Sequence, residues 1–275
     1  MFKIHIINTG YIMADGGAMF GAIPKRAWAR KFPADRDNKC PLAMRCVLAI
    51  SEDRKVLIDT GIGEKHLDKI SYYQPYDLID IEQSLNSYNL RNEDITDVIL
   101  THLHFDHCGY ATRKDKQGKV ISSFPNARYW VSRKQWANFQ NPNRLEKDSF
   151  FIDNIIPIHK EGLLHLVEED IDIDGNLRLK LFDGHTPGQL VGYLDTTEGM
   201  IAFPGDLIPT SAHIALEWIS AYDICALTSI MEKERFLNEA VKNDYQIIYC
   251  HDPYITKSRI KKLNDNYKAF DLSNC

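Results

Sequence analysis

Short runs of alternating or clustered hydrophobic residues dominate the chain, and they predict strands more often than helices. Most of these runs end at Gly, Pro, Asn or Asp, which are the residues that favour turns. We therefore predict strands over residues 1–10, 44–51, 55–61, 95–100, 126–132, 177–182, 189–194, 199–203 and 246–250.

Fewer segments show a helical period. Apolar positions predict an amphipathic helix from Asp77, taken as its N-cap, to Leu90. Ser229 and Glu232 form a capping-box pattern that opens a helix running through Val241. We also predict a helical turn over residues 133–139, a basic amphipathic helix over residues 256–270, loops over residues 15–25 and 113–119, and loops with short helices over residues 141–170.

Length and composition limit the number of domains and the classes of partner that this chain can have. The chain has 275 residues, of which 44% are hydrophobic, and it shows no repeat or linker, so we expect residues 1–275 to form a single domain. The net charge of -5 comes from interspersed charges, and no basic face for nucleic acid is expected. No apolar run approaches the roughly 20 residues of a membrane span, and the start lacks a signal-peptide pattern. We expect a cytoplasmic protein with no membrane partner.

The highest density of candidate functional residues follows the predicted strand 95–100. Four candidate metal ligands lie within six residues there: His102, His104, Asp106 and His107. Single histidines on a strand usually have structural roles, but four such residues beside Gly109 indicate a metal site. His5, His66, His159 and His165 lie in no comparable cluster and are interpreted as structural or surface residues.

Three more candidate ligands, His185, Asp206 and His251, also lie just past predicted strands, in loops that carry Gly or Pro. A tetrahedral zinc takes about four donors, so seven candidates are too many for one ion. Two metals that share a carboxylate would use all seven.

Some neighbouring residues allow two interpretations. Asp59 ends a strand just before Gly61 and either caps a turn or accepts a hydrogen bond from a ligand histidine. Cys108 and Cys250 adjoin candidate ligands; thiolates bind zinc, but we favour small residues packed behind the site. The six cysteines form no CxxC pair, so we expect reduced thiols.

The motif His102-x-His104-x-Asp106-His107, the Gly184–Gly188 box, Gly205-Asp206, the late His251 and the strand end at Asp59 together resemble the metallo-β-lactamase superfamily of metallohydrolases. The resemblance implies an α+β fold, a four-layer αβ/βα sandwich of two mixed sheets with helices on the outer faces. It covers nearly the whole chain.

The resemblance also implies roles for the seven ligands. His102, His104 and His185 would hold one metal, and Asp106, His107 and His251 the other, with Asp206 between them. Because His104 is not a glutamate, the family's iron oxidoreductases are not the matching branch. We expect two Zn²⁺ per chain, although the ligand set also suits manganese, iron or cobalt. A bridging hydroxide would be the nucleophile, and Asp106 would pass its proton to the leaving group.

Within the superfamily, the chain looks most similar to N-acyl-homoserine lactonases and methyl-parathion-hydrolase-like proteins. Many such lactonases carry a tyrosine three positions after the bridging aspartate, where this chain has Pro209. Tyr222, Tyr254 and His213 are the candidate substitutes. The substrate pocket is predicted to include these three residues together with Met19, Phe20, Phe105 and Trp218.

We therefore expect a dinuclear zinc hydrolase of a small ester or lactone, with a small molecule as its partner. Phosphotriester or phosphodiester hydrolysis on the same site is the alternative, because two cations also suit phosphoryl transfer. A non-catalytic metal-binding module is the alternative of another class, which the complete ligand set disfavours. The apolar loop 18–28 is compatible with a homodimer.

Overall fold

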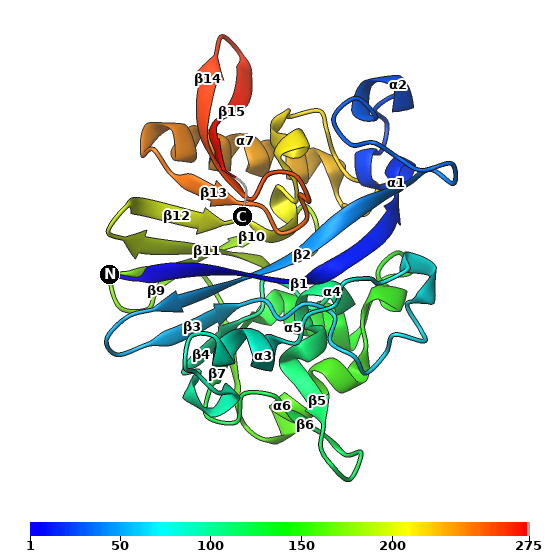
Figure 1. Ribbon diagram of the computed structural model, residues 1–275. Helices are drawn as coiled ribbons and strands as arrows, with labels where there is room; N and C mark the ends of the chain where they lie inside the picture. Colours follow the sequence, from blue (N-terminus) through cyan, green and yellow to red (C-terminus); the bar gives the residue numbers. More distant parts are fainter. Residues whose placement is uncertain (274–275) are drawn as a thin grey trace.

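The computed structural model describes residues 1–273, with side chains through residue 270. Cys275, one of the cysteines predicted to be reduced, lies outside this range. The first half of the chain forms a six-stranded mixed sheet (Figure 1). β1, β2 and β3 pair antiparallel, and β3, β4, β7 and β8 pair parallel. These strands are β1 (Lys3–Asp15), β2 (Lys39–Ile50), β3 (Lys55–Ile58), β4 (Asp97–Ile99), β7 (Arg128–Ser132) and β8 (Leu164–Val167).

The second half forms a seven-stranded mixed sheet in the order β15-β14-β13-β12-β11-β10-β9. β12 and β13 are parallel, and the other neighbours are antiparallel. The strands are β9 (Ile171–Asp172), β10 (Leu177–Phe182), β11 (Gln189–Thr196), β12 (Gly199–Phe203), β13 (Gln246–Ile248), β14 (Lys257–Leu263) and β15 (Asn266–Ser273). A separate hairpin joins β5 (Thr112–Lys114) to β6 (Val120–Ser122).

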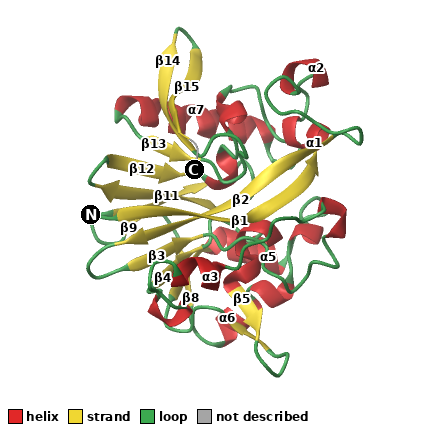
Figure 2. Ribbon diagram, in the orientation of Figure 1, coloured by secondary structure: helices red, strands yellow, loops and turns green. Residues whose placement is uncertain are grey.

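The two sheets face each other, and helices cover their outer faces (Figure 2). Alternate residues of β2 and β3, such as Val47 and Ile58, pack between the sheets against Leu190 and Phe203. The other faces pack against helices: α3 (Ile81–Asn86), α5 (Arg133–Gln140) and α6 (Ile156–Lys160) on the first sheet, and α7 (Ala226–Lys242) on the second. The predicted α+β sandwich is confirmed. No helix in the described residues has the length and apolar content to cross a membrane.

The predicted helix over residues 256–270 is wrong. This segment is the β14–β15 hairpin, which projects from the second sheet (Figure 1). Ser258 and Ile260 are buried while Arg259 and Lys261 are not, which is the two-residue period of a strand. Asn264, in the left-handed region at φ 54°, makes the turn.

The helix predicted from Asp77 is shorter than expected. Asp77 adopts φ 47°, so the helix starts only at Ile81, where the side chain of Asp80 accepts a hydrogen bond from the Glu82 amide. Residues 113–119, predicted as a loop, form the end of β5 and the turn that leads to β6.

The predicted Gly-rich loop over residues 15–25 contains the short helix α1 (Gly16–Phe20) and ends at the first residue of a second one, α2 (Lys25–Trp28). Asp15 caps α1 by accepting from the Ala18 amide. A Cβ atom at Gly16 would lie 2.3 Å from the Trp28 ring, so the glycine allows α1 and α2 to pack closely.

The predicted capping box at Ser229 is also wrong, because α7 begins three residues earlier and buries Ser229. Its Glu232 carboxylate instead accepts hydrogen bonds from the Asp183 and Gly184 amides. The strands predicted over residues 177–182 and 199–203 are confirmed with their boundaries as β10 and β12.

Candidate metal centre

The seven predicted ligands meet at one edge of the two sheets. His102 and His104 follow β4, and Asp106 and His107 lie on the short α4 (Phe105–Cys108) directly after them. The second sheet supplies the others from the loops that follow β10, β12 and β13: His185, Asp206 and His251. Because strand ends are fixed by the sheet, these side chains stand on rigid supports.

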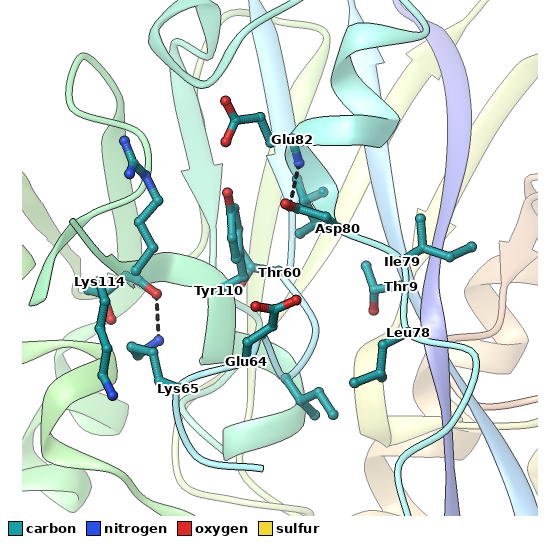
Figure 3. Close-up of a pocket in the computed structure, with 15 residues that line it drawn as sticks. Thr9, Thr60, Glu64, Lys65, Leu78, Ile79, Asp80, Glu82, Tyr110 and Lys114 are labelled. Carbon is teal, nitrogen blue, oxygen red and sulfur yellow. Dashed lines mark hydrogen bonds between the residues drawn. The ribbon is translucent and has the colours of Figure 1, made fainter. Parts of the chain in front are cut away.

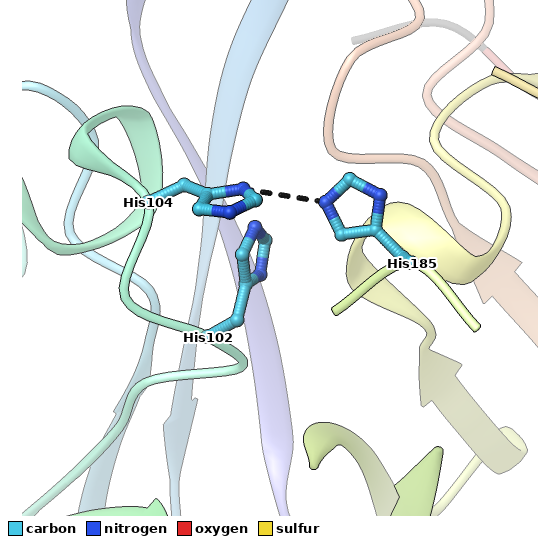
Figure 4. A group of neighbouring side chains, drawn as sticks. All are labelled: His102, His104 and His185. Atoms are coloured by element: carbon cyan, nitrogen blue, oxygen red, sulfur yellow. Dashed lines mark hydrogen bonds between the residues drawn. The ribbon is translucent and has the colours of Figure 1, made fainter. Parts of the chain in front are cut away.

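Three histidines form the first group. The ligand atoms of His102, His104 and His185 lie within 4.8 Å of one another, and all three residues are buried. His104 Nδ1 and His185 Nε2 are 3.3 Å apart. Figure 4 shows the His102 and His104 rings approaching from one side and the His185 ring from the other.

The second group contains Asp106, His107 and His251, whose ligand atoms again lie within 4.8 Å of one another. His107 Nε2 is 3.1 Å from His251 Nε2, and Asp106 Oδ2 is 3.5 Å from His251 Nε2.

Asp206 stands between the two groups. Its Oδ1 lies 3.3 Å from His107 Nε2 and 3.2 Å from His251 Nε2, while its Oδ2 lies 3.4 Å from His185 Nε2. One carboxylate therefore presents an oxygen to each group.

Buried partners fix the tautomers of four histidines. Asp59, Glu146 and Asp223 bind His107 Nδ1 at 2.8 Å, His104 Nε2 at 3.2 Å and His185 Nδ1 at 2.9 Å. His251 Nδ1 donates to the Ala43 carbonyl at 2.7 Å. Each imidazole thus gives its N–H to an outer acceptor and turns its lone pair toward the centre.

This arrangement fits cations. The His107 and His251 lone pairs face each other at 3.1 Å, those of His104 and His185 at 3.3 Å, and the buried His102 Nε2 has no hydrogen-bond partner in the described residues. Lone pairs held this closely repel unless a proton or a metal ion lies among them. Imidazoles with carboxylates are a donor set that zinc accepts.

The charge pattern agrees with this. Burial and the neighbouring histidines hold the pKa of His102 well below its ordinary value, so it stays neutral. Burial disfavours charge on His107, but Asp206, Asp106 and Asp59 outweigh burial and raise its pKa well above the ordinary value. Burial likewise opposes charge on Asp206, yet His251, His107 and His185 hold its pKa well below the usual range.

Neither neighbouring thiol offers a thiolate. Burial raises the pKa of Cys108 and of Cys250 to about 12. Cys250 Sγ donates to Asp206 Oδ1 at 3.3 Å, and Cys108 Sγ donates to the Leu103 carbonyl at 3.3 Å. Both thiols are therefore protonated, and Cys250 Sγ lies within 4.8 Å of the ligand atoms of Asp206 and His251, at the border of the centre.

A cavity of about 140 Å³ opens onto the centre. Of the predicted pocket residues, Met19, Phe105 and Tyr222 line it, and sequence reasoning missed Ile12, Ala14, Leu42, Tyr73 and Leu145. Leu145 and Tyr222 are exposed, which places them at the rim.

Four predicted pocket residues lie elsewhere. Phe20 lies in the hydrophobic core around α1 and α2, and Trp218 packs against that core. Their two rings meet edge to face. His213 is buried and donates from Nε2 to the Met19 carbonyl at 2.8 Å. Tyr254 lines a separate cavity near β15.

A larger cavity of about 380 Å³ lies behind the motif loop and contains none of the seven candidate ligands (Figure 3). Lys65 lies in its wall and donates to the Gly109 and Thr112 carbonyls. Thr60, also in the wall, donates from its amide to the His107 carbonyl at 2.7 Å. Lys65 and Thr60, in the wall of this cavity, therefore hold the backbone of the motif loop from the side away from the candidate ligands.

A family model described as "Metallo-beta-lactamase superfamily" matches residues 45–263. A search of curated proteins found no match.

Solved structures share the fold along the whole chain. A probable metal-dependent hydrolase from Staphylococcus aureus is 28% identical, with a TM-score of 0.88 over 98% of this chain and 97% of its own. AidC, a dizinc quorum-quenching lactonase solved with the product N-hexanoyl-L-homoserine, is 21% identical, with a TM-score of 0.79 over 100% of this chain and 95% of its own. The hydrolase AbOPH is 20% identical, with a TM-score of 0.80 and the same coverage.

Proposed function

The chain belongs to the metallo-beta-lactamase superfamily and is a metal-dependent hydrolase, and from this premise we propose that it uses two zinc ions to hydrolyse a small, neutral ester or lactone. One observation carries the proposal. Asp206 points one carboxylate oxygen at each of two ligand groups, which is the arrangement needed to share a ligand between two cations.

In this proposal His102, His104 and His185 hold one cation, and Asp106, His107 and His251 hold the other. Two cations held there would supply an activated water at neutral pH and polarise the substrate's carbonyl oxygen. The chain's own carboxylates keep the imidazoles oriented. Asp106 lines the cavity, and we assign it the transfer of a proton to the leaving group.

The cavity favours a neutral acyl substrate. None of the described residues that line it is a lysine or arginine, and Ile12, Met19, Leu42 and Phe105 give it apolar walls. An anionic phosphodiester would meet Asp106, Asp206 and Glu146, and apart from the two proposed metal ions the lining offers no lysine or arginine to bind its charge. The shared fold with AidC, a dizinc lactonase, supports a lactone as the first substrate to test.

A neutral phosphotriester remains the second candidate, because a lining without lysine or arginine also accommodates a substrate that carries no negative charge. One experiment separates these classes. Zinc-loaded protein should be assayed on an acyl-homoserine lactone, an aryl ester, a thioester, a phosphodiester and a phosphotriester. We expect kcat/KM for the lactone or aryl ester to exceed that for the phosphodiester by at least about 100-fold, and faster hydrolysis of the phosphodiester would refute the proposal.

Asp206→Ala should abolish hydrolysis and lower the metal content, because it removes a ligand from both ions. Metal analysis and the same assays check this, with Asp53→Ala, an exposed turn carboxylate, as the control. Full activity in Asp206→Ala would rule out the two-metal site. Wild-type protein that binds less than about one ion per chain would instead favour a non-catalytic module.

A further inference from the structure

The loop over residues 215–225 serves both the metal centre and the pocket. Its Asp223 binds His185 Nδ1 at 2.9 Å, and its Ala221 and Tyr222 line the cavity. The loop lies between the turn Ser211–Ile214 and α7 and has no regular structure of its own. Something outside the loop must therefore hold its shape.

The later part of the loop is tied to the site. The Ala221 amide donates to the Ala18 carbonyl, and the Ile224 and Cys225 amides donate to the carbonyls of His185 and Gly184. The earlier part bonds mainly within itself: the Trp218 amide donates to Ala215, and the Ile219 amide donates to Glu217.

The side chain of Lys233, on α7, extends to residues 215–219 of this loop. The residue is 1% exposed, and its Nζ donates to the carbonyls of Ala215 and Trp218, both at 2.9 Å. Within the described residues, these are the hydrogen bonds that join residues 215–219 to α7. The charged groups that face the amine are Asp223 and Glu217.

A buried amine is a costly way to fill space. Burial lowers the pKa of Lys233 to about 7, which shows that the site disfavours the ammonium form. An apolar side chain of similar length would avoid this cost, but it would leave two carbonyls without donors. The observed contacts therefore favour a role in holding the loop.

We infer that Lys233 is a positioning residue, which holds the 215–225 loop so that Asp223 orients His185 and Tyr222 forms the pocket wall. The inference rests on the proposed function for its catalytic consequence. Its structural consequence, a fixed loop and a fixed His185, does not depend on which substrate is hydrolysed.

Three variants test the inference. Lys233→Met keeps the length and removes the donors, Lys233→Arg restores donors in a larger side chain, and Lys242→Met changes an exposed lysine of the same helix as the control. Amide hydrogen exchange over residues 215–225, zinc affinity by chelator competition and, where a substrate is found, KM and kcat are measured.

We expect Lys233→Met to speed exchange in the loop at least about tenfold and to weaken zinc binding by the group that contains His185 about tenfold, the size of effect typical of residues that orient ligands. KM should rise more than kcat falls, and Lys233→Arg should recover most of the affinity. If Lys233 only fills space, Met will be tolerated and Arg will not, and that result overturns the inference. A wild-type protein that binds zinc but hydrolyses no substrate refutes the proposed function alone, because exchange and affinity still test the loop.

Discussion

At the scale of single residues, the buried carboxylates beside the histidines decide how well the centre can hold metal. Burial alone would raise the pKa of Glu146, but hydrogen bonds from His104, Thr186 and Asn138 outweigh it and lower the pKa to about 2. Glu146 is therefore ionised at neutral pH and accepts the His104 N–H.

Glu146→Gln should lower zinc affinity by about 10- to 100-fold, because a neutral amide accepts the hydrogen bond of His104 more weakly than a carboxylate does. Chelator competition measures the affinity, and Glu161→Gln, at an exposed residue that ends α6, is the control. Unchanged affinity would show that Glu146 only fills space near the rim.

These orienting residues also show what the sequence could reveal. Asp59 ends a recognisable strand, so the sequence predicts two possible roles for it, a turn cap or a partner of a ligand histidine. In the structure it accepts a hydrogen bond from His107 Nδ1. Glu146 and Asp223 were missed, since they lie 42 and 38 residues from the histidines they bind, in segments without periodicity. Contacts of this kind depend on how loops fold over the site.

His213 gives the protein a predictable acid sensitivity. Burial lowers its pKa from 6.5 to about 4. The unfolded chain therefore binds a proton that the folded chain does not as the pH falls from 6.5 to 4, and stability falls over that window. At about 1.4 kcal/mol per pKa unit, the full effect is roughly 3 kcal/mol.

His213→Gln should remove this part of the pH dependence. Urea unfolding of metal-free protein at several pH values between 6.5 and 4 measures it, with chelator present so that metal release does not contribute. Parallel curves for wild type and variant would show that His213 does not titrate in this way.

At the scale of elements, α7 supports the His185 loop through direct contact. A Cβ atom at Gly184 would lie 2.5 Å from the backbone and hydroxyl of Ser229, so only glycine allows this approach. Gly184→Ala should destabilise the protein by about 1–3 kcal/mol and weaken zinc binding, because it pushes His185 away from its position.

Thermal unfolding and zinc affinity check this prediction together. Gly17→Ala is the control, because its Cβ would closely approach only the end of the Asp15 side chain. Loss of stability with unchanged zinc affinity would show that the loop moves without carrying His185 along.

Strands were predicted better than helices, and the reason is local. Alternation identified β10, where apolar and charged residues take turns, whereas β12 was recognised as a short apolar run that ends at Pro204-Gly205 and is buried on both faces. Residues 256–270 fit a basic helix equally well, since lysines at Lys261, Lys262 and Lys268 obscure a two-residue period. Pairing of β14 with β13, which the sequence does not encode locally, decides the outcome.

At the scale of the whole molecule, the metal centre joins two halves. His102, His104, Asp106 and His107 belong to the first sheet's half, and His185, Asp206 and His251 to the second. The core between the sheets, with Val47 and Ile58 against Leu190 and Phe203, also crosses this boundary. We therefore propose that the chain is one cooperative domain, as its length and composition predict.

Removal of zinc should lower Tm while leaving one unfolding transition. A ligand that binds only the folded state at about 1,000 times its Kd stabilises it by about 4 kcal/mol, which for a chain of this size corresponds to roughly 10 °C. The core between the sheets does not need the metal, so far-UV circular dichroism should stay unchanged on chelation. Calorimetry of the loaded and chelated forms measures both Tm and the number of transitions. Two separate transitions after chelation would mean that the ions, rather than the shared core, hold the halves together.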